Sequence, residues 1–348
     1  MNLLQMANYP FLKESVDYLR ENGPSLDELL YDIAYERTRG LGKERVLEAL
    51  EKGKIDEHSL ISDADQLVEL LSYIIARILV SCINDPYLTR RYALSEAKTA
   101  GNRLSSEDID FIALVASELG LEVDMEDGVC KIHFIHFIKN NPQRRSKPWK
   151  FVDQDLRNGY VVLKDKVRLA RVSQQALQFK IESELPTPVN DQILNSLDNY
   201  IKEIKTSVEE KKNTFKPQDL GKIRVTKLPP CMRTLIAKVQ AGENLPHSGR
   251  FALTAFLHSI GMSSDEVMQL FASSPDFDES KTRYQIEHIT GKISGTEYTP
   301  PECSTMKSYG ICFGEDGLCK KEWMTHPLKY YRVKDKGAKK AGKKDHKE

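Results

Sequence analysis

Four of the six cysteines in this 348-residue chain have neighbours that favour a metal or cluster site. They are Cys231, Cys303, Cys312 and Cys319. Two prolines precede each of the first two, and the last two lie in the glycine-rich stretch YGICFGEDGLCKK. Such residues turn the backbone sharply, and amides freed in the turns can donate hydrogen bonds to sulfur. The chemistry this pattern predicts is ligation of a metal by thiolates.

The spacing of these cysteines leaves three interpretations open. Structural zinc sites usually draw their ligands in close C-x₂₋₄-C pairs, whereas the intervals here hold 71, 8 and 6 residues. Well-separated thiolates suit an iron–sulfur cube, whose ligands need no such pairs. Four unrelated cysteines are the third interpretation. The absence of a C-x-x-C motif and of a nearby base disfavours a redox or catalytic cysteine.

The other two cysteines and two nearby histidines do not suggest a further site. Cys82 follows a long apolar segment and Cys130 lies in the expected strand VCKIHFIHFI, so both are expected to pack as small apolar residues. His133 and His136 share that strand. Three positions apart on a strand, they would point to opposite faces and make poor joint ligands.

An anion site is expected where the stretch PHSGR begins a helix. Ser248 can cap this helix, and Gly261 can end it. His247 and Arg250 flank its first turn. Free N–H groups, the positive end of the helix dipole, an imidazole and a guanidinium would then converge on one spot, which suits an anion the size of a triphosphate. The simpler alternative is an exposed helix start beside an ordinary arginine.

A second candidate binding face lies on the expected helix KTRYQIEHITGK. Lys281, Tyr284 and His288 recur at positions i, i+3 and i+7, so they share one side of the helix. A cation, a stacking ring and an imidazole suit single-stranded nucleic acid. Arg283 is expected to pair with Glu287, four residues further on, rather than with a ligand.

The zero net charge hides an uneven distribution. Residues 1–130 hold 13 Lys and Arg against 25 Asp and Glu, a net charge of −12, and the remainder holds 38 against 26, a net charge of +12. A polyanion would be repelled by the first part and attracted by the second. The basic part also holds the candidate metal ligands and stacking rings, which favours nucleic acid as its partner over a chance difference between solvated faces.

The hydrophobic periodicity places these residues on a mainly α chain. Residues 1–120 are expected to form a helical domain, because apolar residues recur three and four apart. Residues 121–206 are expected to form a small mixed α/β subdomain with a further helix, in which Asp127–Gly128 signals a hairpin. A polar linker, 207–221, leads to a mostly helical domain, 222–331, and the basic tail, 332–348, is expected to be disordered.

The composition excludes some classes of protein. With 40% apolar and 29% charged residues, it is that of an ordinary soluble protein. The most apolar run, 67–83, contains Glu69 and Arg77, so it is expected to be a buried helix rather than a membrane span. No basic segment followed by an apolar one suggests a signal peptide. We therefore expect an intracellular, cytoplasmic protein whose thiols stay reduced.

Five stretches of the C-terminal domain carry a family resemblance. They are LPPCMRTLIAKVQAGENLPHSGRFALTAFLHSIGMSSDEVMQLF (228–271), YQIEHITG (284–291), EYTPPEC (297–303), YGIC (309–312) and GLC (317–319). In these stretches the chain resembles the large subunit of archaeal and eukaryotic DNA primase, and its length suits the archaeal branch. The resemblance covers the whole C-terminal domain in order. The N-terminal part matches more loosely, through its helical layout and NGYVVLKDKVRLAR.

The resemblance implies a cofactor and separate roles for two subunits. In that family the four cysteines ligate one [4Fe–4S] cluster. The large subunit lacks the nucleotidyl-transfer site, so it is not an enzyme by itself, and it forms a heterodimer with a small catalytic subunit through its N-terminal part. Its C-terminal domain holds the single-stranded DNA template and the 5′-triphosphate end of the RNA primer. The stretch PHSGR carries this last role over to His247 and Arg250.

Some expectations remain open beside the resemblance. The small-subunit interface is expected within 131–165, where Trp149, Phe151 and Tyr160 would be exposed; the alternative is that these rings fill the small α/β core. Tyr298 is expected to pack over the cluster. The alternative functions are an iron–sulfur DNA repair enzyme of the glycosylase or nuclease type, in which cysteine spacings are tighter, and a zinc-bearing scaffold protein.

Overall fold

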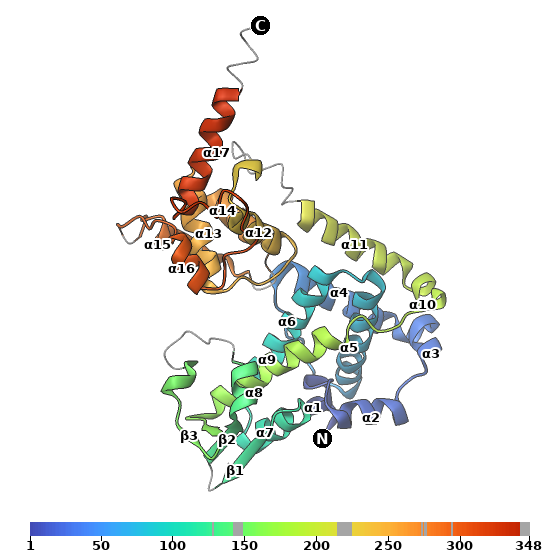
Figure 1. Ribbon diagram of the computed structural model, residues 1–348. Helices are drawn as coiled ribbons and strands as arrows, with labels where there is room; N and C mark the ends of the chain where they lie inside the picture. The colour runs from blue at the N-terminus through green and yellow to red at the C-terminus, as the bar shows by residue number, and fades with distance from the viewer. Residues whose placement is uncertain are drawn as a thin grey trace. The chain divides into compact units, whose positions relative to one another are not determined.

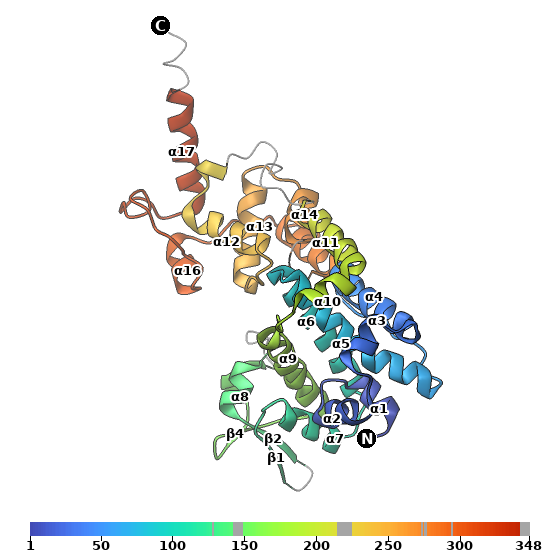
Figure 2. The ribbon, with the colours of Figure 1, turned by 90° about the vertical axis from the view of Figure 1, so that its right-hand side faces the viewer.

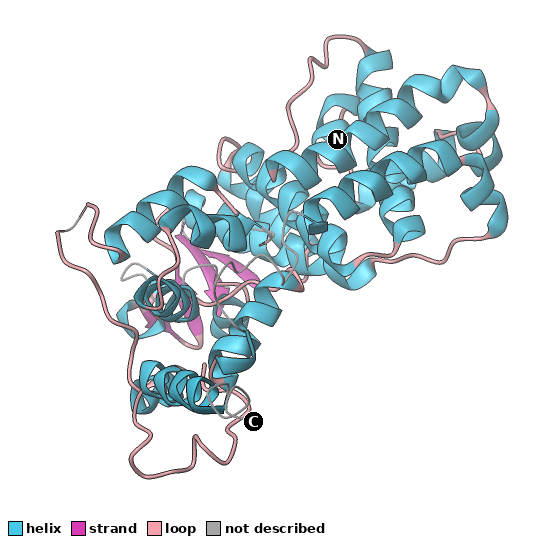
Figure 3. Cartoon of the chain, turned by 90° about the horizontal axis from the view of Figure 1, so that it is seen from above, coloured by secondary structure: helices cyan, strands magenta, loops and turns pink. Residues whose placement is uncertain are grey.

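The computed structural model describes residues 1–126, 129–141, 149–213, 225–272, 274, 277–293 and 295–341. The chain divides into two compact units, Met1–Val208 and Glu209–Glu348. Helices dominate both, and the sheet that the structure describes belongs to the first unit (Figure 3). The expectation of a mainly α fold with a small mixed α/β part is therefore confirmed.

Long helices build the core of the first unit. They are α4 (Glu36–Lys52), α5 (Asp63–Ile83), α6 (Pro86–Leu104) and α9 (Lys166–Glu184). A capping box begins α5, because Ser62 accepts from the Asp65 amide and the Asp65 side chain accepts from the Ser62 amide. The apolar stretch of α5 is 61% buried inside the chain, where it packs against α4 and α1. The expected buried helix is thus found.

Shorter helices complete the first unit. They are α1 (Leu3–Asn8), α2 (Lys13–Asn22), α3 (Leu26–Tyr31), η1 (Ile33–Tyr35), α7 (Ile109–Glu118), α8 (Phe134–Lys139), η3 (Phe151–Asp153), α10 (Asp191–Ser196) and α11 (Asp198–Asn213). The end of α11 shows that 207–213, expected to be linker, is helical instead. Ile201, Ile204 and Val208 on this helix are buried, so core packing extends it into the polar segment. The rest of the expected linker, 214–221, lies outside the described residues.

A buried charge network ties α4, α5 and α6 together. The guanidinium of Arg45 donates to both carboxylate oxygens of Glu96, at 2.7 and 3.0 Å, and to Glu69 at 2.8 Å. Burial alone would disfavour the charged guanidinium, but the carboxylates of Glu96 and Glu69 hold the pKa of Arg45 well above its ordinary value. Because each charge is paired, the network fixes the relative register of three helices.

The sheet is antiparallel throughout, in the order β1-β2-β4-β3. Its strands are β1 (Val123–Glu126), β2 (Val129–His133), β3 (Leu156–Arg157) and β4 (Tyr160–Val162). Glu126 pairs with Val129, as the expected hairpin requires, although Asp127–Gly128 lies outside the described residues. The side chain of Cys130, on β2, is buried in the core that packs against the sheet, as expected.

The prediction of one strand through Ile138 is wrong. The chain leaves β2 after His133 and turns into α8 at once. Phe134 and Phe137, three residues apart, both pack on the core beneath the sheet, which suits a helix rather than a strand. The rings of His133 and His136 consequently lie 6.1 Å apart instead of on opposite faces.

Helices also make up the second unit (Figures 1 and 2). They are η5 (Val225–Lys227), α12 (Pro230–Gln240), α13 (His247–Ser259), α14 (Ser264–Ala272), α15 (Glu279–Ile289), α16 (Cys303–Ser308) and α17 (Pro327–Ala341). The expected disorder of 332–341 is wrong, because α17 continues through it. Leu328, Tyr330 and Tyr331 anchor the first turn of α17, and the Lys- and Ala-rich sequence that follows has high helix propensity. Residues 342–348 lie outside the described residues.

Candidate functional site

The four candidate ligands come from three places in the second unit. Cys231 is the second residue of α12, directly after Pro229 and Pro230, and Cys303 is the first residue of α16. Cys312 and Cys319 lie in the loop between α16 and α17. None of the four is in a disulfide. Helix starts and a turn-rich loop therefore present all four thiols, as the prolines and glycines of the sequence predict.

Backbone and side-chain contacts hold these segments against one another. Gly314, two residues after Cys312, has a left-handed φ of +65°, and a Cβ on it would lie 3.7 Å from Pro230. The Cys303 amide donates to the Thr325 carbonyl at 2.9 Å, which joins the start of α16 to the chain before α17. Lys307 on α16 pairs with Glu315 of the loop at 2.6 Å. The loop is thus fixed beside both helices.

The thiols lie within electrostatic range of one another. Burial, followed by the charges of Cys312, Cys303 and Cys319, raises the pKa of the Cys231 thiol to about 12. Burial and two of the same neighbours raise the pKa of Cys303. Within the part of the chain that the structure describes, however, no three donors lie close enough to hold one metal ion. A tetrahedral zinc site needs thiolates about 3.8 Å apart, whereas a cube, with each thiolate on its own iron, takes a wider set.

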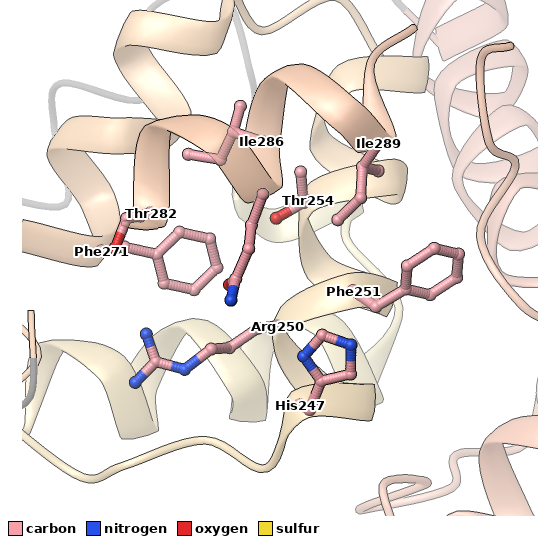
Figure 4. Close-up of a pocket in the computed structure, with 9 residues that line it drawn as sticks. His247, Arg250, Phe251, Thr254, Phe271, Thr282, Ile286 and Ile289 are labelled. Carbon is pink, nitrogen blue, oxygen red and sulfur yellow. The ribbon is translucent and has the colours of Figure 1, made fainter. Parts of the chain in front are cut away.

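The two residues of the expected anion site line one shallow pocket. His247, exposed, is the first residue of α13, and Arg250 lies half-buried one turn further on. The Arg250 Nε donates to the Leu245 carbonyl at 3.3 Å, and the guanidinium lies 5.6 Å from the centre of the Phe271 ring. Figure 4 shows both side chains on the side of the pocket opposite Ile286 of α15. The structure therefore brings this pair together as predicted.

The prediction for Ser248 is wrong. The N-cap of α13 is Pro246, which has extended backbone, so the helix starts earlier than expected. Ser248 is buried inside the first turn, and its hydroxyl has no hydrogen-bond partner among the described residues. No side chain of the described residues caps α13. The Gly249 and Arg250 amides donate to the Pro246 carbonyl at 2.8 and 3.0 Å, which leaves the amides of His247 and Ser248 for a ligand. Gly261 follows the helix end with a left-handed φ of +100°, as predicted.

The expected face of α15 also forms. Tyr284 is 59% exposed, and its ring centre lies 6.3 Å from that of His288. Lys281, in the first turn of α15, pairs with Asp278 at 3.0 Å. The expected Arg283–Glu287 pair is wrong, because Arg283 reaches back to Glu279 at 3.2 Å and across to Asp265 of α14 at 3.4 Å.

Tyr298 joins this face to α13. Its ring stacks on His288, with centres 5.6 Å apart and planes 24° apart, and meets the Phe251 ring edge-on at 5.8 Å. The packing of Tyr298 over the cluster stays a prediction. The Tyr298 amide donates to the Ile289 carbonyl at 2.9 Å, which holds the ring beside α15. No local spacing relates residue 251 to residue 298, so the sequence could not have shown this connection.

Five exposed apolar side chains lie on the small α/β part of the first unit. We call them the α8 patch; they are Ile135, Ile138, Phe151, Val152 and Leu156. The rings of Phe134 and Phe151, 6.3 Å apart, join α8 to η3. Trp149, expected to be exposed, is instead only 9% exposed and stacks on Phe137. Tyr160 is half-buried and bonds to Glu122.

Comparison with known proteins shows which family the chain belongs to. A family model for the C-terminal domain of the eukaryotic and archaeal DNA primase large subunit matches residues 221–340. The chain is 42% identical to the DNA primase large subunit PriL of Methanococcoides burtonii, over 95% of this chain and 92% of that protein. The chain belongs to the DNA primase large subunit family. PriL proteins of Methanosarcina mazei and Halobacterium salinarum are 41% and 34% identical, over 96% and 94% of this chain and 89% and 92% of theirs.

Membership in the DNA primase large subunit family places the chain in a primase complex that acts in DNA replication. It replaces the alternative of a DNA repair enzyme. The family match extends over the four cysteines, the start of α13 and the whole of α15. The residues that the sequence singled out in the second unit therefore all lie in the part of the primase large subunit that the family model describes.

Proposed function

We propose that the chain is the non-catalytic, regulatory subunit of an archaeal DNA primase. It forms a heterodimer with the small catalytic subunit. Its second unit holds the single-stranded template and the 5′-triphosphate end of the RNA primer at initiation. The observation that carries the proposal is one surface on which the His247 and Arg250 pocket adjoins the aromatic stack of α15. This role belongs in the cytoplasm and needs no membrane.

The start of α13 would take the phosphates. The amides of His247 and Ser248, which come before the first bonded amides of the helix, lie at the positive end of its dipole. Arg250 can offer a charge-assisted hydrogen bond, and His247, exposed beside it, can donate another. A terminal triphosphate, with several charges in a small volume, fits this convergence better than a single backbone phosphate, because more of the donors can be used at once.

The aromatic stack would take bases. Tyr284 presents an exposed ring, and His288 and Tyr298 behind it form a supported platform that reaches Phe251 of α13. Stacking on such a surface tolerates any base sequence. Lys281, near the start of the same helix, is exposed and can exchange its ion pair with Asp278 for a backbone phosphate. The surface would thus recognise a primer–template junction by its shape and charge rather than by its sequence.

A [4Fe–4S] cluster is the cofactor that the four cysteines fit best. The charges of the other three thiols act on Cys231, which supports a site shared by all four. Bound there, the cluster would supply covalent links among α12, α16 and the loop before α17, and so contribute folding free energy to a small unit. Cys231, Cys303, Cys312 and Cys319 would be its ligands. Zinc is the alternative metal for the same four thiolates.

The α8 patch would dock the small subunit. It combines Val152, 86% exposed, with the rings and branched side chains of α8 and β3. Such grouping of large apolar side chains on a surface usually marks an interface. The patch falls within the segment 131–165 expected for this role. Trp149 of that segment is buried, so it supports the patch from the core and would not contact the small subunit.

Reconstitution with the small catalytic subunit tests this function. When both chains are expressed together, they should elute together in gel filtration, and the heterodimer should start primers from nucleoside triphosphates faster than the small subunit alone. The large chain by itself should make no primer. Primer synthesis by the isolated large chain, or failure to associate, would contradict the proposal.

A further inference from the structure

The segment before α17 carries an exposed tryptophan that the proposed site does not use. Trp323 is 47% exposed, whereas the only other tryptophan of the chain, Trp149, is 9% exposed. Lys329, on α17, donates to the Trp323 carbonyl at 2.6 Å and places its ammonium 5.4 Å from the centre of the indole. The indole is thereby held in position while much of its surface remains open to solvent.

Further cations flank Trp323 in the sequence. Lys320, Lys321, Lys329 and Arg332 are exposed, and none of them forms an ion pair within the residues that the structure describes. Of the three nearby acids, Glu315 pairs with Lys307, whereas Asp316 accepts from the neutral Tyr330 hydroxyl and keeps its charge. Glu322 is the third, so the cations of the surface still outnumber the nearby acids without an ion pair among the described residues.

The same surface extends over the first turns of α17. Lys334 lies 5.8 Å from the centre of the Tyr330 ring. Arg233 of α12, which is also exposed, lies close enough for its charge to act on Tyr330. We call Trp323 and these cations the Trp323 surface; its members are Arg233, Lys320, Lys321, Trp323, Lys329, Arg332 and Lys334. Six of them lie within residues 320–334, in the loop after Cys319 and on α17, and the fold adds Arg233 from α12.

We propose that the Trp323 surface is a second binding site for single-stranded nucleic acid, separate from the pocket of His247 and Arg250. One base stacks on the indole, and the neighbouring phosphates contact Lys321 and Lys329. This inference rests on the proposed function and adds to it a place where single strand beyond the junction is held. With two binding sites, the second unit would cover more nucleotides of the single strand than with one.

The chemistry favours a nucleic acid over an acidic peptide. Lysines alone would attract either polyanion. An exposed indole beside cations, however, offers a flat face for stacking. Only a ligand that carries both a ring and a negative charge, as a nucleotide does, can contact the indole and the cations together. A run of acidic side chains would satisfy the lysines and leave the indole in water. An acidic peptide is therefore the competing occupant that the experiment must distinguish.

Binding of the full-length, metal-loaded chain to a 5′-hydroxyl oligodeoxythymidine tests the inference. Fluorescence anisotropy of the labelled oligonucleotide gives the affinity. Trp323→Ala should weaken binding about tenfold, as expected for the loss of one stacked base, and Trp323→Phe should retain most of it. Lys321→Gln and Lys329→Gln should each reduce the slope of log K against log[salt] by about 0.7. Lys205→Gln, an exposed lysine of the first unit, is the matched control and should change neither quantity.

The outcomes separate this site from the proposed function. Discrimination between 5′-triphosphate and 5′-hydroxyl primers should survive Trp323→Ala and should depend on Arg250 instead. Loss of that discrimination in Trp323→Ala would overturn the separation of the two sites. Unchanged oligonucleotide affinity in Trp323→Ala, or an equal loss of affinity for polyglutamate, would overturn the inference itself. If Trp323→Ala folds poorly, the two lysine variants test the inference instead, and unchanged salt slopes in both would overturn it.

Discussion

The imidazole of His288 stacks on the Tyr298 ring, with centres 5.6 Å apart and planes 24° apart. His288 belongs to α15, and Tyr298 also meets Phe251 of α13. One tyrosine outside any helix thus connects the helix with the candidate stacking residues to the helix with the candidate phosphate residues. A change at Tyr298 should therefore affect binding even where Tyr298 touches no ligand.

Replacing Tyr298 tests this positioning role. Tyr298→Ala removes the ring that supports His288 and should weaken binding of a primer–template junction by about fivefold to tenfold, within the range of one aromatic stack. Tyr298→Phe keeps both ring contacts and should bind like the original chain. Fluorescence anisotropy with a labelled junction gives both affinities. Equal weakening by the two variants would point to the hydroxyl instead of the stack.

Association with the small subunit should depend on the α8 patch. Val152→Asp places a charge on the most exposed apolar residue of the patch and should weaken the heterodimer at least tenfold, because a buried unpaired charge is costly at an interface. Ile33→Asp is the matched control, since Ile33 is also 86% exposed but lies on η1. Calorimetric titration with the small subunit measures both. An effect of Ile33→Asp alone would place the interface elsewhere.

Stability of the first unit should depend on Arg45. Arg45→Ala leaves Glu69 and Glu96 buried without their partner and should lower the free energy of unfolding by about 3–5 kcal/mol. Arg37→Ala removes an exposed ion pair with Asp65 and should cost about 1 kcal/mol or less. Urea unfolding followed by circular dichroism compares the two. Similar losses in both variants would contradict the account of a tightly coupled network.

The metal-free second unit should lose stability at alkaline pH. The folded chain raises the pKa of Cys231 to about 12, chiefly by burial, and raises those of Cys303, Cys312 and Cys319. The protonated thiols therefore contribute stability that is present below the ordinary thiol pKa, about 8.5, and is lost as the pH rises toward about 12. Unfolding of chelator-treated chain between pH 7 and pH 10.5 measures this loss.

Metal loading should reverse that dependence. Ligand thiols bind as thiolates, so loading releases protons and becomes more favourable as the pH rises. Anaerobically purified chain should contain iron and absorb visible light, and removal of the metal should lower the melting temperature of the second unit while leaving the first unit unchanged. A chain that is equally stable with and without metal would argue against a structural cofactor.

Local sequence predicted the helices and several site residues because their signals are local. The i, i+3, i+7 spacing placed Tyr284 and His288 on one face, and the glycine after α13 marked its end. Ser248 misled the prediction because Pro246 can begin a helix without any hydroxyl cap, so the serine falls inside the first turn. The strand predicted through Ile138 failed because Phe134 and Phe137 pack at helical spacing on the same core. The Phe251–Tyr298 contact and the place of Arg233 beside α17 join residues far apart in the chain, which only folding reveals.

The affinity of the full-length chain for RNA–DNA primers with 5′-triphosphate or 5′-hydroxyl ends, compared before and after Arg250→Ala, tests the central claim most directly. We predict that the original chain prefers the triphosphate end and that Arg250→Ala weakens binding to that end about tenfold or more, the range of a lost charge-assisted hydrogen bond, with little change at the hydroxyl end. An equal loss at both ends, or no preference in the original chain, would contradict it.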